Sequence, residues 1–222
     1  MTPRPLFAMH EPLLEVVKET HLSRKPAQGS ALVALGSVAM LLVTSTVCWL
    51  DPALEATLAA TPEAIFERGE YWRLLTAIAT HADFLHFLSN GVALGILSYL
   101  LYGYYGPWVY PVWSWALGSA AMGLAVATYP PGTFLVGASG VVYLMAGFWL
   151  TLYLFIERRV SMSKRWIRAV GFGLIVLMPT VLKPSVSYRS HAIGFGIGLG
   201  FGVGYYLLKK RDFCRAERVE WE

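Results

Sequence analysis

The chain has 222 residues, of which 56% are hydrophobic and 14% are charged, and its formal net charge is +4. Soluble proteins carry about 25% charged residues, whereas the 73 residues from Phe84 to Ile156 include no Asp, Glu, Lys or Arg. This composition excludes a soluble globule and indicates an integral membrane protein. It does not indicate a nucleic-acid-binding protein, because the basic residues cluster beside apolar segments as topology determinants.

Six apolar segments reach or approach the length of about 20 residues that a helix needs to span a bilayer core. Turn-forming clusters at 103–107 and 130–132 separate three of them within the long uncharged stretch. We therefore expect an all-α integral membrane protein, a bundle of six transmembrane helices. The expected spans are residues 31–50, 84–102, 108–129, 138–156, 166–182 and 190–208.

The basic residues favour one orientation of this bundle. Four of them precede the first span, five lie between the fourth and fifth or in the first turn of the fifth, and five follow the sixth, which places 14 of the 18 on one side. Because basic residues concentrate on the cytoplasmic side, we expect both termini in the cytoplasm. Residues 1–30 then form a cytoplasmic segment, 31–208 the membrane domain and 209–222 a basic cytoplasmic tail. We interpret Glu11–Thr20 as a short amphipathic helix on the cytoplasmic surface.

In this topology the second, fourth and sixth spans all run from outside to inside. His86 and Asn90, Ser139, and His191 therefore lie near the outer ends of three parallel helices. Polar side chains inside a membrane usually serve a function. A serine and a histidine at one depth indicate a protease that cuts within the membrane.

Ser139 lies in the run Gly137-Ala138-Ser139-Gly140, at the expected start of the fourth span. The unpaired backbone N–H groups of a first helical turn can donate to a developing oxyanion. Helix packing is the alternative, because small residues allow close contact between helices. The run differs from the soluble hydrolase elbow Gly-x-Ser-x-Gly, since Val141 occupies the last glycine position.

His191 is the only histidine after His86, and it is therefore the only candidate base on spans three to six. A structural histidine with satisfied hydrogen bonds is the alternative. Two glycine stripes follow it, and such stripes let another helix approach at backbone contact. Close packing of span six on span four is expected to bring the imidazole within hydrogen-bond reach of the Ser139 hydroxyl. The stripes are Gly194, Gly198 and Gly202, and Gly196, Gly200 and Gly204.

The sequence offers no carboxylate to orient this histidine, so a Ser-His dyad is a better prediction than a triad. Tyr143, one turn after Ser139, is expected to hold the imidazole by stacking. His86 and Asn90 share a helix face and can donate to an oxyanion, with a polar contact between helices as the alternative. His81 and His86 are poorly spaced for metal ligands, and we expect no metal and no cofactor.

These motifs together resemble the rhomboid family of intramembrane serine proteases, over about residues 67–204. Trp72-Arg73 is similar to the family's first-loop signature, and the spacing of His81, His86 and Asn90 is similar to its second-helix pattern. The Gly-x-Ser-Gly and His-x-x-Gly-x-x-x-Gly motifs correspond to Gly137, Ser139 and Gly140 and to His191, Gly194 and Gly198. Ser190 departs from the family, which usually has alanine there.

The resemblance implies a set of roles. Ser139 would be the nucleophile, His191 the base, and His86, Asn90 and the Ser139 amide the oxyanion hole. The first loop with Trp72 and Arg73 would lie partly in the outer leaflet, and the fifth helix with the loop 183–190 would gate substrate entry.

The substrates expected are single-pass transmembrane proteins in a prokaryotic inner membrane, cut near the outer boundary. A catalytically silent relative that binds client helices is the main alternative, and a small-solute transporter is the third class. The sequence predicts no oligomeric state.

Overall fold

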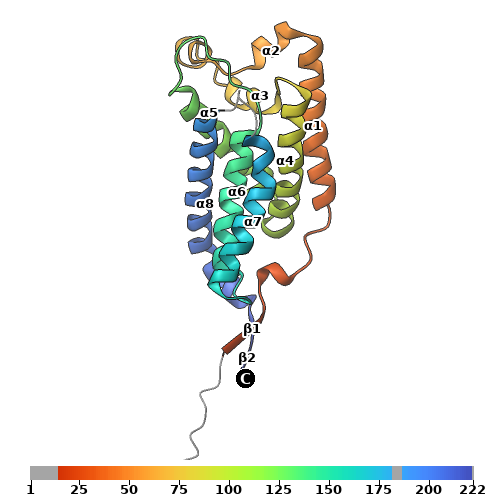
Figure 1. Cartoon of the computed structure of the whole chain (residues 1–222), viewed down its shortest axis with the longest axis vertical. Helices are drawn as coiled ribbons and strands as arrows, with labels where there is room; N and C mark the ends of the chain where they lie inside the picture. Colours follow the sequence, from red (N-terminus) through yellow and green to blue (C-terminus); the bar gives the residue numbers. More distant parts are fainter. Residues whose placement is uncertain (1–14, 182–186, 222) are drawn as a thin grey trace, which may run out of the picture.

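The computed structural model describes residues 15–181 and 187–221, and nearly all of its elements are helices. Figure 1 shows the long helices running side by side along the longest axis of the molecule. In chain order the elements are β1 (Glu15–Glu19), η1 (His21–Ser23), α1 (Ser30–Leu50), α2 (Pro52–Leu58), η2 (Glu63–Glu67), α3 (Arg73–Ala79), α4 (Phe84–Tyr105), η3 (Trp108–Trp113), α5 (Ser114–Val126), α6 (Ser139–Ile156), α7 (Met162–Val181), α8 (Tyr188–Arg215) and β2 (Arg218–Trp221).

The predicted all-α membrane bundle is confirmed. Within the described ranges, five helical segments are long and apolar enough to cross a membrane, namely α1, α4, η3 with α5, α6 and α8. The predicted span 166–182 falls in α7, except for residue 182, which lies outside the described residues. Lys164, Arg165 and Arg168 occupy the first turns of α7 and shorten its apolar stretch. The helix nevertheless packs against α4 and α6 as a member of the bundle.

Helix α6 lies at the centre of the bundle, and α1 and α8 lie at its outside. In an apolar 18-residue stretch of α6, 67% of the residues are buried, compared with 22% in the corresponding stretches of α1 and α8. The outer helices instead expose large apolar side chains such as Leu32, Leu50 and Leu208. An apolar exterior of this kind is stable only against lipid, which agrees with the composition.

The two predicted turn clusters do end helices. Gly106 follows α4 with φ of +83°, and Gly132 lies in the connection between α5 and α6 with φ of +79°. Both values fall in the left-handed region that glycine adopts without steric cost. These breaks divide the 73 uncharged residues into three segments, each antiparallel to the one before it.

The prediction of an amphipathic helix at Glu11–Thr20 was wrong for the part that can be compared. Residues 15–19 form strand β1, which pairs antiparallel with β2 at the other end of the chain; residues 11–14 lie outside the described range. Val16 and Val17 favour a strand, and cross-strand ion pairs join Lys18 to Glu220 and Glu19 to Arg218. This pairing spans nearly the whole sequence, so local periodicity could not reveal it.

The β1–β2 ribbon lies at the opposite end of the molecule from α2 and α3 (Figure 1). Helix α8 reaches it by continuing past the apolar segment to Arg215. The expected boundary between the membrane domain and the basic tail, at 208/209, therefore falls inside a helix.

The first loop, between α1 and α4, is a folded unit held by Arg73. The guanidinium of Arg73 is buried and donates to the carbonyls of Ala56 at 2.6 Å and Ala59 at 3.0 Å, and to the Glu70 carboxylate at 2.5 Å. Ala60 and Leu135 exchange two backbone hydrogen bonds of 3.0 and 2.9 Å. The loop is thus joined to the segment that leads into α6.

Candidate active site

Ser139 is the first residue of α6 and is only 7% exposed. No side chain caps this helix start, so its first-turn amides are available as donors. The preceding Gly137 has φ of +114°, and its amide donates to the carbonyl of Ala77 in α3 at 2.8 Å. The first loop therefore fixes the backbone immediately before the serine.

His81 is a second anchor for this segment. The amide of Ala138 donates to His81 Nε2 at 3.3 Å, and Nδ1 lies 3.0 Å from the hydroxyl oxygen of Ser45 in α1. Since Nε2 accepts, Nδ1 carries the proton and donates to Ser45. Burial lowers the pKa of His81 to about 3, and the neighbouring His86 adds to the effect. The uncharged His81 side chain thus links α1 to Ala138, the residue before Ser139, by hydrogen bonds.

His86 and Asn90 lie on α4 beside the same segment. A Cβ added to Gly137 would lie 2.7 Å from His86 Cε1 and 3.5 Å from Asn90 Nδ2. Only glycine fits at position 137, for this reason and because of its positive φ. The predicted proximity of the His86–Asn90 pair to the serine segment is therefore present.

His191 lies in the first turn of α8 and is 4% exposed. Its imidazole stacks on the ring of Tyr143, with centroids 4.0 Å apart and planes inclined by 13°. The expected stacking contact is thus present, and it fixes the plane of the imidazole. Figure 1 shows α8 beside α6, the helix that carries both Ser139 and Tyr143.

The start of α8 is fixed by a cap that the sequence reasoning missed. The Ser187 hydroxyl accepts from the Ser190 amide at 3.2 Å and forms a hydrogen bond of 2.8 Å with the hydroxyl of Tyr129. The Arg189 guanidinium carbon lies 4.7 Å from the centre of the Tyr129 ring. The signal available in the sequence was a serine just before an apolar run, which is typical of a helix N-cap.

Helices α6 and α8 are in backbone contact along one glycine stripe. A Cβ at Gly194 would overlap the carbonyl oxygen of Gly140, and one at Gly198 would overlap that of Leu144. In the same way, a Cβ at Gly202 would lie 2.7 Å from the Cβ of Thr151. The prediction of close packing between spans four and six is confirmed for this stripe.

The second stripe has a different environment. Added Cβ atoms at Gly196, Gly200 and Gly204 would meet nothing within 4 Å. The expectation that both stripes form helix contacts was therefore wrong for this one. Successive stripes two residues apart point in different directions around a helix, and only one can face α6.

Close packing brings the neighbours of both candidate catalytic residues together. A Cβ at Gly140 would lie 3.7 Å from the carbonyl oxygen of Ser190. Among the described residues, His191 Nε2 is buried without a hydrogen-bond partner, so it makes no hydrogen bond to the Ser139 hydroxyl in this structure. In free enzymes such bonds are often long and tighten when substrate binds.

Asn90 is also buried with unsatisfied groups. Within residues 15–181 and 187–221, neither Asn90 Nδ2 nor Asn90 Oδ1 has a hydrogen-bond partner. Buried polar atoms without partners are rare, and each needs an explanation. An amide donor next to Gly137 that has no partner is available to a substrate oxygen.

Trp72 and Arg73, which the sequence analysis placed in the first loop, lie outside this group. Arg73 holds the first loop, and Trp72 is 54% exposed on the same loop. Asp83 caps α4 by accepting from the His86 amide at 2.7 Å. In the described part of the chain, no cluster of three or more potential metal ligands occurs. Of the predicted gate loop 183–190, residues 183–186 lie outside the described residues, and the rest form the cap and first residues of α8.

Comparison with known proteins gives a family match and a similar protein. Residues 68–209 match the model of the Rhomboid domain family. The chain is also 27% identical, over 159 residues, to a protein of Bacillus subtilis (strain 168) named "Putative rhomboid protease YdcA". This match covers 68% of the chain and 72% of that protein.

Proposed function

Because the chain belongs to the rhomboid family, we propose that it is an intramembrane serine protease with Ser139 as nucleophile and His191 as base. The proposal rests on one arrangement. Ser139 begins α6, His191 lies in the first turn of α8, and their neighbours Gly140 and Ser190 are in contact. A serine with a histidine beside it, both inside a membrane protein, fits acyl transfer.

The proposed reaction uses this chain's own groups at each step. His191 Nε2 takes the proton of the Ser139 hydroxyl as the oxygen attacks the peptide carbonyl, and the C=O π bond opens to an oxyanion. His191 then gives the proton to the leaving amine as the C–N bond breaks. Water attacks the resulting ester in the same way, with His191 again accepting and returning the proton.

The oxyanion would lie between α4 and the start of α6. The Asn90 amide has no other partner and lies next to Gly137, and the His86 ring lies beside it. The uncapped Ser139 amide would donate from the opposite side. Preorganised donors of this kind typically stabilise such a transition state by about 3–4 kcal/mol each.

Orientation of the base comes from stacking and packing. Tyr143 holds the plane of the His191 ring, and the Gly194–Gly140 contact fixes the height of α8 against α6. Asp83, which lies near His86 in sequence, accepts from a backbone amide at the start of α4. Tyr143 and the Gly194–Gly140 contact thus orient His191 without a carboxylate, which supports a Ser139–His191 dyad.

The proposed substrates are single-pass transmembrane proteins, cut near the outer membrane boundary after local unwinding, because a hydrogen-bonded helix hides its carbonyls. The protein would be a multi-pass protein of a prokaryotic cell membrane with both termini in the cytoplasm. Water would reach the buried site from the exterior, past the fifth helix and the loop after it.

The test is cleavage of a model transmembrane substrate in proteoliposomes by the wild type, Ser139→Ala and His191→Ala. Ser98→Ala is the matched control, because it removes a buried serine hydroxyl that lies two turns along α4 from Asn90 and donates to the Gly95 carbonyl of its own helix. We expect activity to be lost in the first two variants and kept in the control. Cleavage by purified Ser139→Ala would eliminate the mechanism.

A fluorophosphonate probe separates this proposal from a silent relative that binds client helices. Ser139 reacts only if His191 activates it. Labelling that disappears in both Ser139→Ala and His191→Ala supports catalysis. A wild-type chain that stays unlabelled, yet binds a client helix, indicates the binding protein instead.

A further inference from the structure

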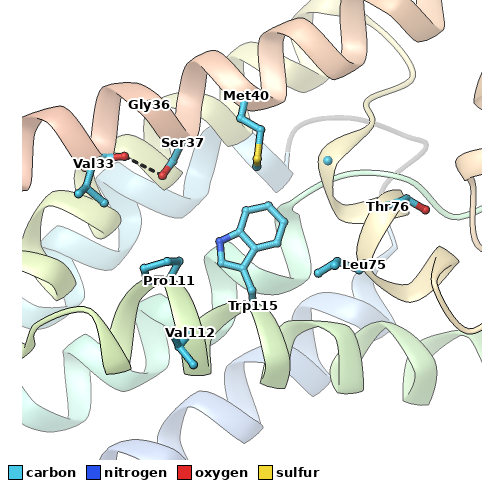
Figure 2. A pocket seen from close by; sticks show the side chains of 10 residues that line it. Val33, Gly36, Ser37, Met40, Leu75, Thr76, Pro111, Val112 and Trp115 are labelled. Atoms are coloured by element: carbon cyan, nitrogen blue, oxygen red, sulfur yellow. Dashed lines mark hydrogen bonds between the residues drawn. The ribbon is translucent and has the colours of Figure 1, made fainter.

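A cavity of about 660 Å³ lies between α1, α3 and the segment formed by η3 and α5. Figure 2 shows it from close by, with α1 along one side, the η3–α5 segment along the other and the Trp115 side chain projecting between them. Helix α3 closes one end of the cavity through Leu75 and Thr76. The lining residues are Val33, Gly36, Ser37, Met40, Leu75, Thr76, Ala79, Pro111, Val112 and Trp115.

The lining is apolar, and both of its hydroxyl groups are already used. Ser37 donates to the Val33 carbonyl at 2.7 Å and accepts from the Tyr110 hydroxyl at 2.6 Å. Thr76 donates to the carbonyl of Leu58 at 2.9 Å. No ionisable side chain is among the lining residues. A water in such a cavity would lack the two to four polar partners it needs.

The cavity lies at membrane depth. Its α1 residues belong to the interior of the candidate span Ser30–Leu50, and those of η3 and α5 belong to the candidate span Trp108–Val126. Met40 and Val112 at its rim are 42% and 45% exposed, so the cavity opens to the outside of the bundle. There the surrounding medium is hydrocarbon, and an empty space would lose dispersion contacts with it.

The size of the cavity distinguishes between two kinds of apolar occupant, the face of another protein and a lipid chain. Ten residues line it, whereas a stable protein interface uses about 20–30 residues on each side. The occupant is therefore smaller than the face of another protein or of a second copy of the chain. We propose that the cavity is a binding site for one acyl chain of a membrane phospholipid.

Occupancy has a consequence for the active site, and this step rests on the proposed function. Helix α3 forms one wall of the cavity through Leu75, Thr76 and Ala79. At its last turn the Ala77 carbonyl accepts the hydrogen bond from Gly137, two residues before Ser139. A bound acyl chain would thus support the helix that holds the nucleophile segment.

The test fills the cavity with a side chain. A Cβ at Gly36 would meet nothing within 4 Å, so Gly36→Trp places an indole in the cavity without a clash on α1. Gly200→Trp is the matched control, because it makes the same change at an open position on α8, away from the cavity. Met40→Trp fills the cavity from a neighbouring position and decides the result if Gly36→Trp does not fold.

The probe is a phosphatidylcholine with a photoreactive diazirine in one acyl chain, in vesicles made of phosphatidylcholine. Adducts on Leu75 and Val112 are counted relative to adducts on the exposed α7 residues Ile167 and Leu174, which report ordinary contact with lipid. We expect this ratio to exceed unity in the wild type and in Gly200→Trp, and to fall to unity or below in Gly36→Trp and Met40→Trp.

Two results would overturn the proposal. The first is an equal ratio in the wild type and both cavity variants. The second is a cross-linked dimer that Gly36→Trp abolishes, which would assign the cavity to a second copy. The ratio does not depend on proteolysis and can be measured in Ser139→Ala. A chain that captures lipid but never cleaves therefore refutes only the proposed function.

Discussion

Gly194→Ala tests whether backbone contact between α6 and α8 sets the position of His191. The added Cβ would overlap the Gly140 carbonyl oxygen and lie 3.1 Å from its carbon. These are backbone atoms at the start of α6, and no flexible side chain can move aside. The helices must therefore separate, by a distance on the order of 1 Å, and such a displacement costs about 100-fold in rate.

The stability cost of this overpacking is about 1–3 kcal/mol. Gly196→Ala is the control, because the same methyl group meets nothing within 4 Å and gains about 0.5–1 kcal/mol from better helix formation. Substrate cleavage in proteoliposomes and thermal unfolding are measured for both variants. Equal activity and equal stability in the two variants would refute the idea that this contact positions the histidine.

Three further predictions concern His81, the cap of α8 and Arg73 in the first loop. The unfolded chain protonates His81 near pH 6.5, whereas the folded chain holds its pKa at about 3. The free energy of unfolding should therefore fall by about 1.4 kcal/mol for each unit by which the pH decreases from 6.5 towards 3. His81→Asn should flatten this slope in unfolding measured against pH, and an unchanged slope contradicts the anchor role. Ser187→Ala removes the cap of α8 and should lower stability by about 1 kcal/mol, with Ser187→Asp restoring it; equal thermal unfolding of the two variants would exclude the cap. Arg73→Ala leaves two carbonyls of the first loop without a donor and should cost about 3 kcal/mol, whereas the exposed Arg68→Ala, which loses a bond to the same Glu70, should cost less than about 1 kcal/mol; similar losses in both would show that burial does not matter here.

The membrane-spanning elements were predictable because each depends on a continuous stretch of sequence. A span needs about 20 apolar residues, and its ends are marked by glycine, proline or charge. The predicted 84–102 and 138–156 accordingly agree with α4 and α6 within a few residues. The seven residues of α8 beyond Leu208 were missed because a helix can continue in water after its apolar stretch ends.

The contact between Tyr143 and His191 was predicted because Tyr143 lies one turn after Ser139 on the same helix face, and the structure contains this contact. The role of His81 could not be predicted, because its partners Ser45 and Ala138 lie 36 and 57 residues away. The sequence pattern shows that a histidine occupies position 81, but it does not show that the His81 ring accepts from the amide of Ala138.

The class of protein, the positions of its helices and the serine, histidine and asparagine available for chemistry could all be predicted from the residues alone, because hydrophobic length and residue type are local properties. Three features required the folded arrangement: which glycine stripe faces α6, the pairing of residues 15–19 with residues 218–221 as strands, and the cavity beside α3. Each of these depends on how far apart two elements lie in space, and that distance is set by the packing of the whole bundle.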